Sequence, residues 1–305
     1  MSLRAELVRM VLRRSVKRDS EPDPGLVVLR QRFDAARRYF PDPPKGTKAT
    51  TVDAGGVKGV RITVPQSLSD RHILYFHGGG YVSGSPAYYR DFIWRVAAAS
   101  SAHVLCIYYR LSPEHPFPAA LDDAVSAYSW LLAQGAAPAC IAIMGDSAGG
   151  GLAFATLLRL REEGLPPPAA VVALSPWTDL AMTGESLRIN ASKDPMLKPE
   201  RAASCARMYL AGADPLNPYA SPLYGDPAGL PPALIQVGSD EILRDDSVRM
   251  ADKLRAAGCP VDLEIWPRMP HVWQVFARVM PEARRAIERI GGFLQREMNS
   301  PARYS

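Results

Sequence analysis

The stretch CIAIMGDSAGGGLA, residues 140–153, decides the fold of this chain. An apolar run comes directly before G-D-S-A-G, and small and apolar residues follow it. This pattern predicts a buried strand, a sharp turn and a helix. Glycine stands at 145 and 149, where so tight a turn leaves no room for a Cβ atom. The turn lifts the Ser147 hydroxyl to the helix start, where the Ala148 N–H group and the helix dipole favour negative charge. We therefore predict Ser147 as a nucleophile and Ala148 as an oxyanion donor.

On both sides of this stretch, short apolar runs alternate with helical patterns. The alternation predicts an α/β fold, with a mostly parallel central sheet of about eight strands and helices on both faces. Nearly continuous apolar runs fit parallel strands, which are buried on both faces. Residues 47–305 are expected to form this catalytic domain, with ligands at the carboxyl ends of the strands. The expected strands are 48–53, 57–64, 72–76, 103–109, 140–144, 169–174, 233–237 and 261–266.

Two segments do not follow this alternation. Residues 1–46 contain two amphipathic helical patterns, and residues 181–225 contain a helical stretch near 198–211 with a Pro-rich return. We expect the two segments to form a helical cap above the strand ends. The apolar positions that repeat at helical spacing are Leu3, Leu7, Met10 and Val11 in the first pattern, and Leu26, Leu29, Phe33 and Phe40 in the second.

A glycine-rich loop follows the expected strand 72–76, in the sequence FHGGGYVSG at 76–84. Three consecutive glycines after a buried strand allow two backbone N–H groups to point into one cavity, as in the second half of an oxyanion hole. The alternative is a phosphate-binding turn. That reading needs a following Lys-Ser/Thr pair and a helix that opens on the loop, and the sequence has neither.

His271 is the expected general base. In folds with a strand-turn-helix nucleophile, the chain order is serine, acid, histidine, and of five histidines only His271 follows both partners. The acid must lie just after the strand 233–237, which leaves Asp240 and Glu241. Asp245 and Asp246 come later and are expected to cap the free N–H groups at the start of the next helix.

Three motifs in order resemble one family. They are HGGG at 77–80, YRLSPEHPFPAALDDA at 109–124 and GDSAGG at 145–150. They are similar to the hormone-sensitive-lipase family of esterases, the bacterial family IV branch of the α/β-hydrolase fold, from about residue 48 to the end of the chain. The resemblance implies a carboxylic ester hydrolase for short or medium acyl chains, without metal or organic cofactor. It also implies a helical cap and a homodimer formed through the sheet edge.

The family's motifs assign roles to individual residues. The second and third glycines of the loop, Gly79 and Gly80, supply oxyanion N–H groups together with Ala148, and Arg110 and Glu114 are expected to be structural anchors. The family's acid motif D-P-L-x-D stands here as E-I-L-R-D, and an ungapped match places Glu241 rather than Asp240 in the acid position. The predicted triad is therefore Ser147, Glu241 and His271.

Three further sequence features shape the expected site. Gly151 replaces the family's asparagine and should loosen the helix start slightly, and Val272 replaces the glycine after the histidine and should narrow access to the imidazole. Tyr81 and Trp177 are expected either to shape the acyl and alcohol pockets or to pack in the core.

Composition narrows the classes of function. The net charge of +5 arises in residues 1–40, where solvated arginines explain it better than a nucleic-acid face does. Four cysteines without C-x-x-C spacing fit a reducing, cytoplasmic compartment, and the sequence has no signal-peptide pattern and no run of 18 apolar residues. Two alternatives to an esterase stay open on the same fold: a ligand-binding receptor, against which His271 argues, and an amidase or peptidase.

Overall fold

A computed structural model of the chain describes residues 1–15, 25–36 and 43–298. Its centre is a single sheet of eight strands in the order β1-β2-β4-β3-β5-β6-β7-β8. Strands β3 to β8 are parallel, whereas β2 pairs antiparallel with both β1 and β4. The strands are β1 (Lys48–Asp53), β2 (Lys58–Thr63), β3 (His72–Phe76), β4 (His103–Ile107), β5 (Ile141–Asp146), β6 (Ala170–Leu174), β7 (Ala233–Gly238) and β8 (Val261–Trp266).

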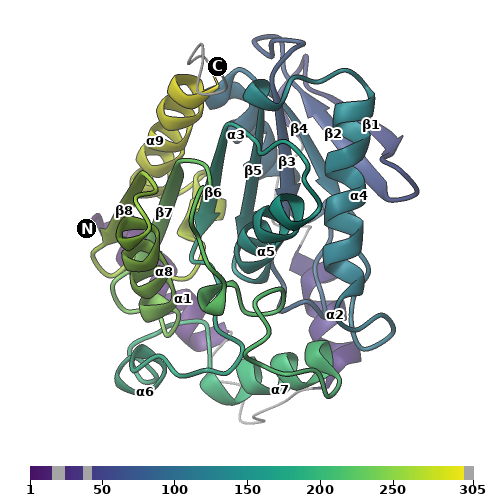
Figure 1. Cartoon of the computed structure of the whole chain (residues 1–305). Helices are drawn as coiled ribbons and strands as arrows, with labels where there is room; N and C mark the ends of the chain where they lie inside the picture. The colour runs from purple at the N-terminus through teal and green to yellow at the C-terminus, as the bar shows by residue number, and fades with distance from the viewer. Residues whose placement is uncertain (16–24, 37–42, 299–305) are drawn as a thin grey trace.

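Helices cover both faces of this sheet (Figure 1), which confirms the predicted α/β architecture. Helices α4 (Ala119–Ala133), α5 (Ala148–Glu162) and α8 (Arg244–Ala256) lie on one face. Helices α3 (Arg90–Ser100) and α9 (Pro281–Glu297) pack against each other and cover the opposite face. Because side chains of a strand alternate between its faces, neighbouring residues of β3 enter different cores. Leu74 and Phe76 join the α4/α5 core, and Ile73 and Tyr75 join the α3/α9 core.

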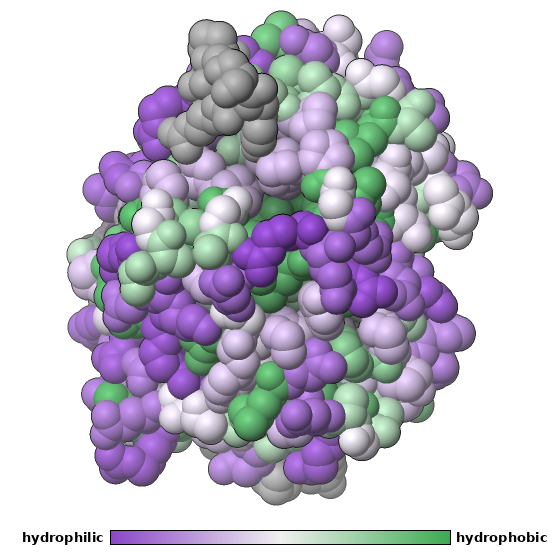
Figure 2. Space-filling view, viewed as in Figure 1, coloured by the Kyte–Doolittle hydropathy of each residue, from purple (hydrophilic) through white to green (hydrophobic). Residues whose placement is uncertain are grey.

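The remaining helices gather at the carboxyl ends of the parallel strands, where α5 begins (Figure 1). They are α1 (Leu3–Ser15), α2 (Leu26–Ala36), α6 (Ser186–Ile189) and α7 (Pro199–Leu210). On the face shown in Figure 2, hydrophobic residues form patches between hydrophilic ones. Among the described residues, no helix has both the length and the apolar character that crossing a bilayer requires.

Helix α1 forms where the sequence predicts it, but it packs through the face opposite to its apolar repeat. Its buried residues are Ala5, Arg9 and Leu12, whereas Leu3 is 90% exposed and Leu7 is 59% exposed. Polar contacts of Arg9 with the loops below α1 fix this orientation. In the second expected pattern, Phe40 and the side chains of Leu29 and Phe33 lie outside what the structure describes.

Gly151 packs closely within α5, in place of the looseness expected at the helix start. A Cβ atom at this position would lie 2.0 Å from the carbonyl oxygen of Trp177. We therefore predict that Gly151→Ala lowers the free energy of unfolding by about 1–3 kcal/mol, the usual cost of overpacking a core. Equilibrium unfolding in urea measures this change.

A matched helical glycine provides the control. A Cβ atom at Gly292 in α9 would meet no atom within 4 Å, and this residue is exposed. Gly292→Ala should raise the free energy of unfolding by about 0.5–1 kcal/mol, because alanine loses less backbone entropy in a helix. Equal effects of the two substitutions would contradict the close packing at Gly151.

Candidate active site

Ser147 lies at a tight turn between β5 and α5. Its backbone has φ 54° and ψ −121°, a conformation that costs free energy for any residue except glycine. A Cβ atom at Gly145 would lie 2.1 Å from the carbonyl oxygen of Gly149, and one at Gly149 would lie 2.0 Å from that of Phe76. Both positions thus require glycine, as the sequence predicts. The strained turn holds the serine at the carboxyl end of the sheet, as in a nucleophile elbow.

His271 and Glu241 are in direct contact. His271 follows β8, Glu241 follows β7, and His271 Nδ1 lies 2.7 Å from Glu241 Oε2. Both side chains are buried. With its proton on Nδ1, the imidazole donates to Glu241, and its Nε2 atom becomes an acceptor.

The surrounding loops fix the Glu241 carboxylate. Its Oε1 atom accepts hydrogen bonds from the Ser175 hydroxyl at 2.7 Å and from the Gly238 N–H group at 2.6 Å. The Asn190 side chain donates to the Glu241 backbone carbonyl at 2.9 Å, and Asp194 accepts from the N–H group of the next residue at 3.0 Å. Asn190 and Asp194 belong to the segment 181–225, so this segment holds the acid loop in place.

Asp240 has a different partner. Its carboxylate lies 2.9 Å from Arg9 Nη2, and the same guanidinium donates to the Arg268 carbonyl at 2.6 Å. Helix α1 is therefore fastened to the loops that carry Glu241 and His271. Of the two acids that the sequence leaves open, the structure brings Glu241 to the histidine and Asp240 to α1.

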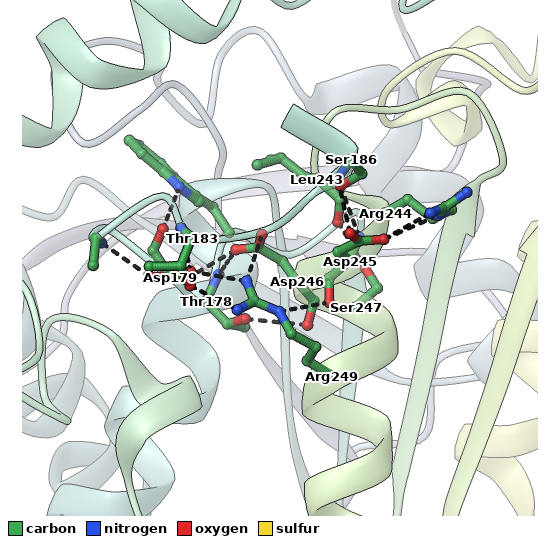
Figure 3. Close-up of polar contacts among 12 residues, drawn as sticks. Thr178, Asp179, Thr183, Ser186, Leu243, Arg244, Asp245, Asp246, Ser247 and Arg249 are labelled. Carbon is green, nitrogen blue, oxygen red and sulfur yellow. Dashed lines mark hydrogen bonds and ion pairs between the residues drawn. The ribbon is translucent and has the colours of Figure 1, made fainter. Parts of the chain in front are cut away.

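Asp245 and Asp246 occupy the first turn of α8, but they do not cap it. The expectation of capping is wrong: neither carboxylate accepts from an N–H group of α8, and the Asp245 N–H group donates instead to the Ser186 hydroxyl at 3.1 Å (Figure 3). Asp245 accepts from the Ser186 N–H group, and Asp246 accepts from the N–H groups of Thr178 and Asp179 at 2.8 and 2.9 Å. These N–H groups lie in the loop after β6 and at the start of α6, and they need acceptors. Burial, followed by the charge of Asp179, raises the pKa of Asp246 to about 8.

The glycine-rich loop lies beside Ser147. Gly79 has φ 128° and Gly80 has φ 65°, which a residue with a side chain rarely adopts. A Cβ atom at Gly79 would lie 2.1 Å from the Ser83 carbonyl oxygen, and one at Gly80 would lie 3.0 Å from Cys205 Sγ. Both glycines and Ser147 line the same cavity. Ala148 is the first residue of α5, so its N–H group has no acceptor within the helix.

Asp146 joins the glycine-rich loop to the nucleophile turn. Its carboxylate accepts hydrogen bonds from the Gly78 N–H group at 2.9 Å, from Tyr75 at 2.5 Å and from Tyr89 at 2.8 Å. Burial raises the pKa of Asp146 to about 6, against the opposing effect of these hydrogen bonds. Since Asp146 directly precedes Ser147, the carboxylate fixes the loop relative to the serine.

A cavity of about 270 Å³ connects these groups. Ser147 and His271 both line it, together with Trp177. Tyr81 is buried and stacks on Tyr209 with ring centroids 3.8 Å apart, so it packs in the core. Further lining residues come from the end of α1, from the segment before α7, from α7 itself and from the segment after His271: Ser15, Met196, Leu197, Lys198, Arg201, Ala202, Cys205, Val272 and Val275.

Three groups act on the imidazole of His271. Burial lowers its pKa, but the hydrogen bond and charge of Glu241, with the charges of Asp194 and Asp146, outweigh burial and raise the pKa above the usual 6.5. Val272, which follows the histidine, has φ 51°, where the family pattern has glycine. Its side chain lines the cavity beside the imidazole.

The predicted anchors, Arg110 and Glu114, lie outside the cavity lining. Arg110 pairs with Asp123 at 2.8 Å. Glu114 pairs with Arg30 of α2 at 2.6 Å, and Arg30 also donates to the Val82 carbonyl at 2.8 Å. The hydrogen bond from Arg30 lowers the pKa of the Glu114 carboxyl to about 2. Helix α2 is therefore fastened to the segment that follows the glycine-rich loop.

Sequence reasoning missed the residues that support this site. Ser175 directly follows β6, and a polar residue at that strand end is a signal that could have found it. Arg9 and Arg30 stand among other arginines of the N-terminal helices, and no local pattern distinguishes them. Asn190 and Asp194 act through contacts across about 50 positions of the chain.

Comparisons with known proteins place the chain among esterases. A family model described as alpha/beta hydrolase fold matches residues 73–275. An acetyl-hydrolase of Streptomyces hygroscopicus is 48% identical over 231 residues, which is 76% of this chain and 77% of that protein. An esterase of Acinetobacter venetianus is 35% identical over 284 residues, or 93% of each chain.

A solved structure agrees with these sequence matches. The crystal structure of an esterase from the bacterial hormone-sensitive lipase family has a TM-score of 0.93 and 43% identity, and the match covers 98% of this chain and 99% of that one. The family model covers most of the sheet, and the three matched proteins cover between 76% and 98% of this chain. The chain therefore belongs to the bacterial hormone-sensitive-lipase family of the α/β-hydrolase fold, and it is a carboxylic ester hydrolase.

Proposed function

We propose that the chain is a serine carboxylesterase that hydrolyses short- and medium-chain esters through an acyl-enzyme intermediate. One observation carries the proposal. Ser147, on its strained turn, and His271, whose Nδ1 atom lies 2.7 Å from Glu241, line the same cavity. A nucleophile, a base and an acid that orients the base are the parts that acyl transfer requires.

In the proposed mechanism, Ser147 Oγ attacks the ester carbonyl carbon while His271 Nε2 takes the hydroxyl proton. Glu241 keeps the second imidazole proton on Nδ1 and stabilises the imidazolium cation. The tetrahedral intermediate collapses as His271 returns the proton to the leaving alcohol, and Ser147 retains the acyl group. Water then attacks the acyl-enzyme with His271 again as base, which releases the carboxylic acid and restores the serine.

The proposed oxyanion donors are the N–H groups of Gly79, Gly80 and Ala148. Support comes from the two glycines in the cavity lining and from the position of Ala148 at the start of α5. Removal of one such donor lowers turnover by a factor of about 10² to 10³, so the contribution of the loop to the rate is comparable to that of the base. Asp146, which holds Gly78, is the proposed positioning residue for this loop.

Cavity size supports the preference for short and medium acyl chains. The volume of about 270 Å³ lies below the roughly 300–1,000 Å³ of pockets for drug-sized ligands. Trp177, Leu197, Leu243 and Val275 give the lining an apolar character. The name of the S. hygroscopicus relative, an acetyl-hydrolase, points in the same direction.

A panel of 4-nitrophenyl esters tests this proposal. The values of kcat/KM for acetate, butyrate and octanoate should exceed that for the longer palmitate by about tenfold or more, because acyl carbons that do not fit lose binding free energy. The 4-nitroanilide of butyric acid should react far more slowly than the ester. Preferred cleavage of the anilide would favour an amidase, and folded protein without any hydrolysis would favour a receptor.

Further parts of the proposal concern assembly and compartment. Helices α1, α2, α6 and α7 are proposed to act as the cap, which their position at the strand ends supports. Strand β8 lies at the sheet edge and Ile265 on it is 45% exposed, which supports a homodimer formed through this edge. Among the described residues the four cysteines form no disulfide, which supports a reducing compartment such as the cytoplasm.

A further inference from the structure

Arg201 differs from the other arginines near the site. It lies in the first turn of α7 and lines the cavity that contains Ser147. Its Nε and Nη2 atoms are buried, and within the described part of the chain they have no hydrogen-bond partner. By contrast, Arg9, Arg30 and Arg249 each pair with a carboxylate. Arg201 as a whole is half-buried, but two guanidinium nitrogens that are buried without a partner are unfavourable, so such a group is usually matched by an anion.

The position of Arg201 on α7 directs it inward. Cys205 and Tyr209 follow it at intervals of four residues, which places the three side chains on one helix face. Cys205 and Tyr209 are both buried. Arg201 is therefore a cation on an otherwise buried face of α7, and this face lies next to the glycine-rich loop.

The charges around the cavity favour an anionic ligand. Lys198, which directly precedes α7, also lines the cavity. Asp146 is the one carboxylate among the described lining residues, and hydrogen bonds from Tyr75, Tyr89 and the Gly78 N–H group already engage it. No carboxylate of the described chain is therefore positioned to neutralise Arg201.

We propose that Arg201 is a specificity-determining residue that binds an anionic oxygen group of the substrate, a carboxylate. The inference rests on the proposed esterase function and names its substrate class: esters that carry a free carboxylate on either the acyl or the alcohol part. A guanidinium donates in a planar fork that matches a carboxylate, and the apolar lining strengthens the pairing. The attacked ester lies at Ser147, and the carboxylate lies toward α7.

Pairs of esters that differ only in this charge test the proposal. The acyl arm compares mono-4-nitrophenyl adipate with its neutral methyl ester, and the alcohol arm compares 4-acetoxybenzoate with methyl 4-acetoxybenzoate. For the wild-type enzyme we expect the ratio of kcat/KM, charged over neutral, to be about tenfold or more in one arm, the effect of a charge-assisted hydrogen bond. The arm that responds identifies the part of the substrate that carries the carboxylate.

Substitutions on α7 test whether Arg201 causes this preference for the charged ester. Arg201→Gln should lower the ratio by about tenfold or more, whatever its effect on the neutral ester, because the amide carries no charge. Arg201→Lys should give an intermediate ratio, since it keeps the charge and loses the fork. Arg207→Gln is the matched control: this arginine lies on the same helix but is exposed, so the ratio should not change.

The outcomes separate this inference from the proposed function. Hydrolysis of neutral esters with a ratio at or below one in both arms would contradict the inference alone. So would a ratio that Arg201→Gln and Arg207→Gln change equally. Absence of hydrolysis of both charged and neutral esters would instead contradict the esterase mechanism on which the inference rests.

Discussion

Replacement of Ser147 by alanine should abolish ester turnover, the largest effect predicted for this chain. Loss of the serine nucleophile in a well-studied serine hydrolase lowers kcat by a factor of about 10⁶, and the remaining rate comes from the oxyanion hole and from binding. Ser147 occupies the same mechanistic position here, on the turn between β5 and α5. We expect the 4-nitrophenyl butyrate turnover of Ser147→Ala to fall by about 10⁴ or more.

A second serine in the cavity lining provides the control. Ser15 lies at the end of α1, and its hydroxyl donates to the Val11 carbonyl at 2.8 Å. Turnover of Ser15→Ala should stay close to that of the wild type. A serine-directed organophosphate should add its mass to the wild type and to Ser15→Ala, but not to Ser147→Ala. Turnover of Ser147→Ala within tenfold of the wild type would contradict the acyl-enzyme mechanism.

Replacement of Glu241 by glutamine should have the second largest effect, a loss of kcat by a factor of about 10² to 10⁴. Glutamine can keep the hydrogen bonds with Ser175 and Gly238, because its amide oxygen still accepts. Its amide nitrogen would face His271 Nδ1 and donate to it, which moves the imidazole proton to Nε2. In that tautomer the imidazole cannot accept the serine proton.

The pH dependence separates this catalytic effect from simple destabilisation. The imidazole must be neutral to act as a base, so kcat/KM rises as pH increases through the His271 pKa. Glu241 helps to hold this pKa above 6.5. In the wild type, the acid limb should therefore have its midpoint above pH 6.5. In Glu241→Gln the negative charge that raises the His271 pKa is lost, whereas burial still lowers this pKa. The midpoint of the acid limb should therefore move to lower pH.

Asp240→Asn is the matched control for this prediction. The substitution weakens the pair with Arg9 but leaves the contact between Glu241 and His271 intact. Turnover should therefore change by less than about tenfold, because the pair is only partly buried and acts through loop position. If Asp240→Asn abolishes activity and Glu241→Gln does not, the assignment of the triad acid is wrong.

The sheet and the nucleophile turn follow from local sequence patterns. The apolar runs predict strands β3 to β7 to within a few residues, since these parallel strands are buried on both faces and leave continuous apolar segments. The glycines at 145 and 149 predict the turn, because its geometry excludes a Cβ atom. The contact of Glu241 with His271 agrees with the register of the acid motif, in which the strand end fixes the loop position.

The predictions that were wrong concern features that depend on contacts between distant segments of the chain. The apolar repeat of α1 predicts the helix but not its orientation, because Arg9 and its two partners decide which face turns inward. Asp245 and Asp246 have the sequence position of caps, but buried N–H groups of the segment 178–186 compete for their oxygens. No local sequence pattern distinguishes Arg201, because the lack of a partner for its Nε and Nη2 atoms among the described residues depends on the side chains that surround it in the cavity wall.

Exchange of N-terminal segments between relatives is constrained by the two arginines that fasten α1 and α2. Arg9 reaches Asp240 about 230 positions away, and Arg30 reaches Glu114 about 80 positions away. A chimera that takes residues 1–46 from another esterase must therefore carry compatible partners at 240 and 114. Without them, the graft would leave a charge unmatched beside the acid loop, even where the helices themselves are well suited to the core.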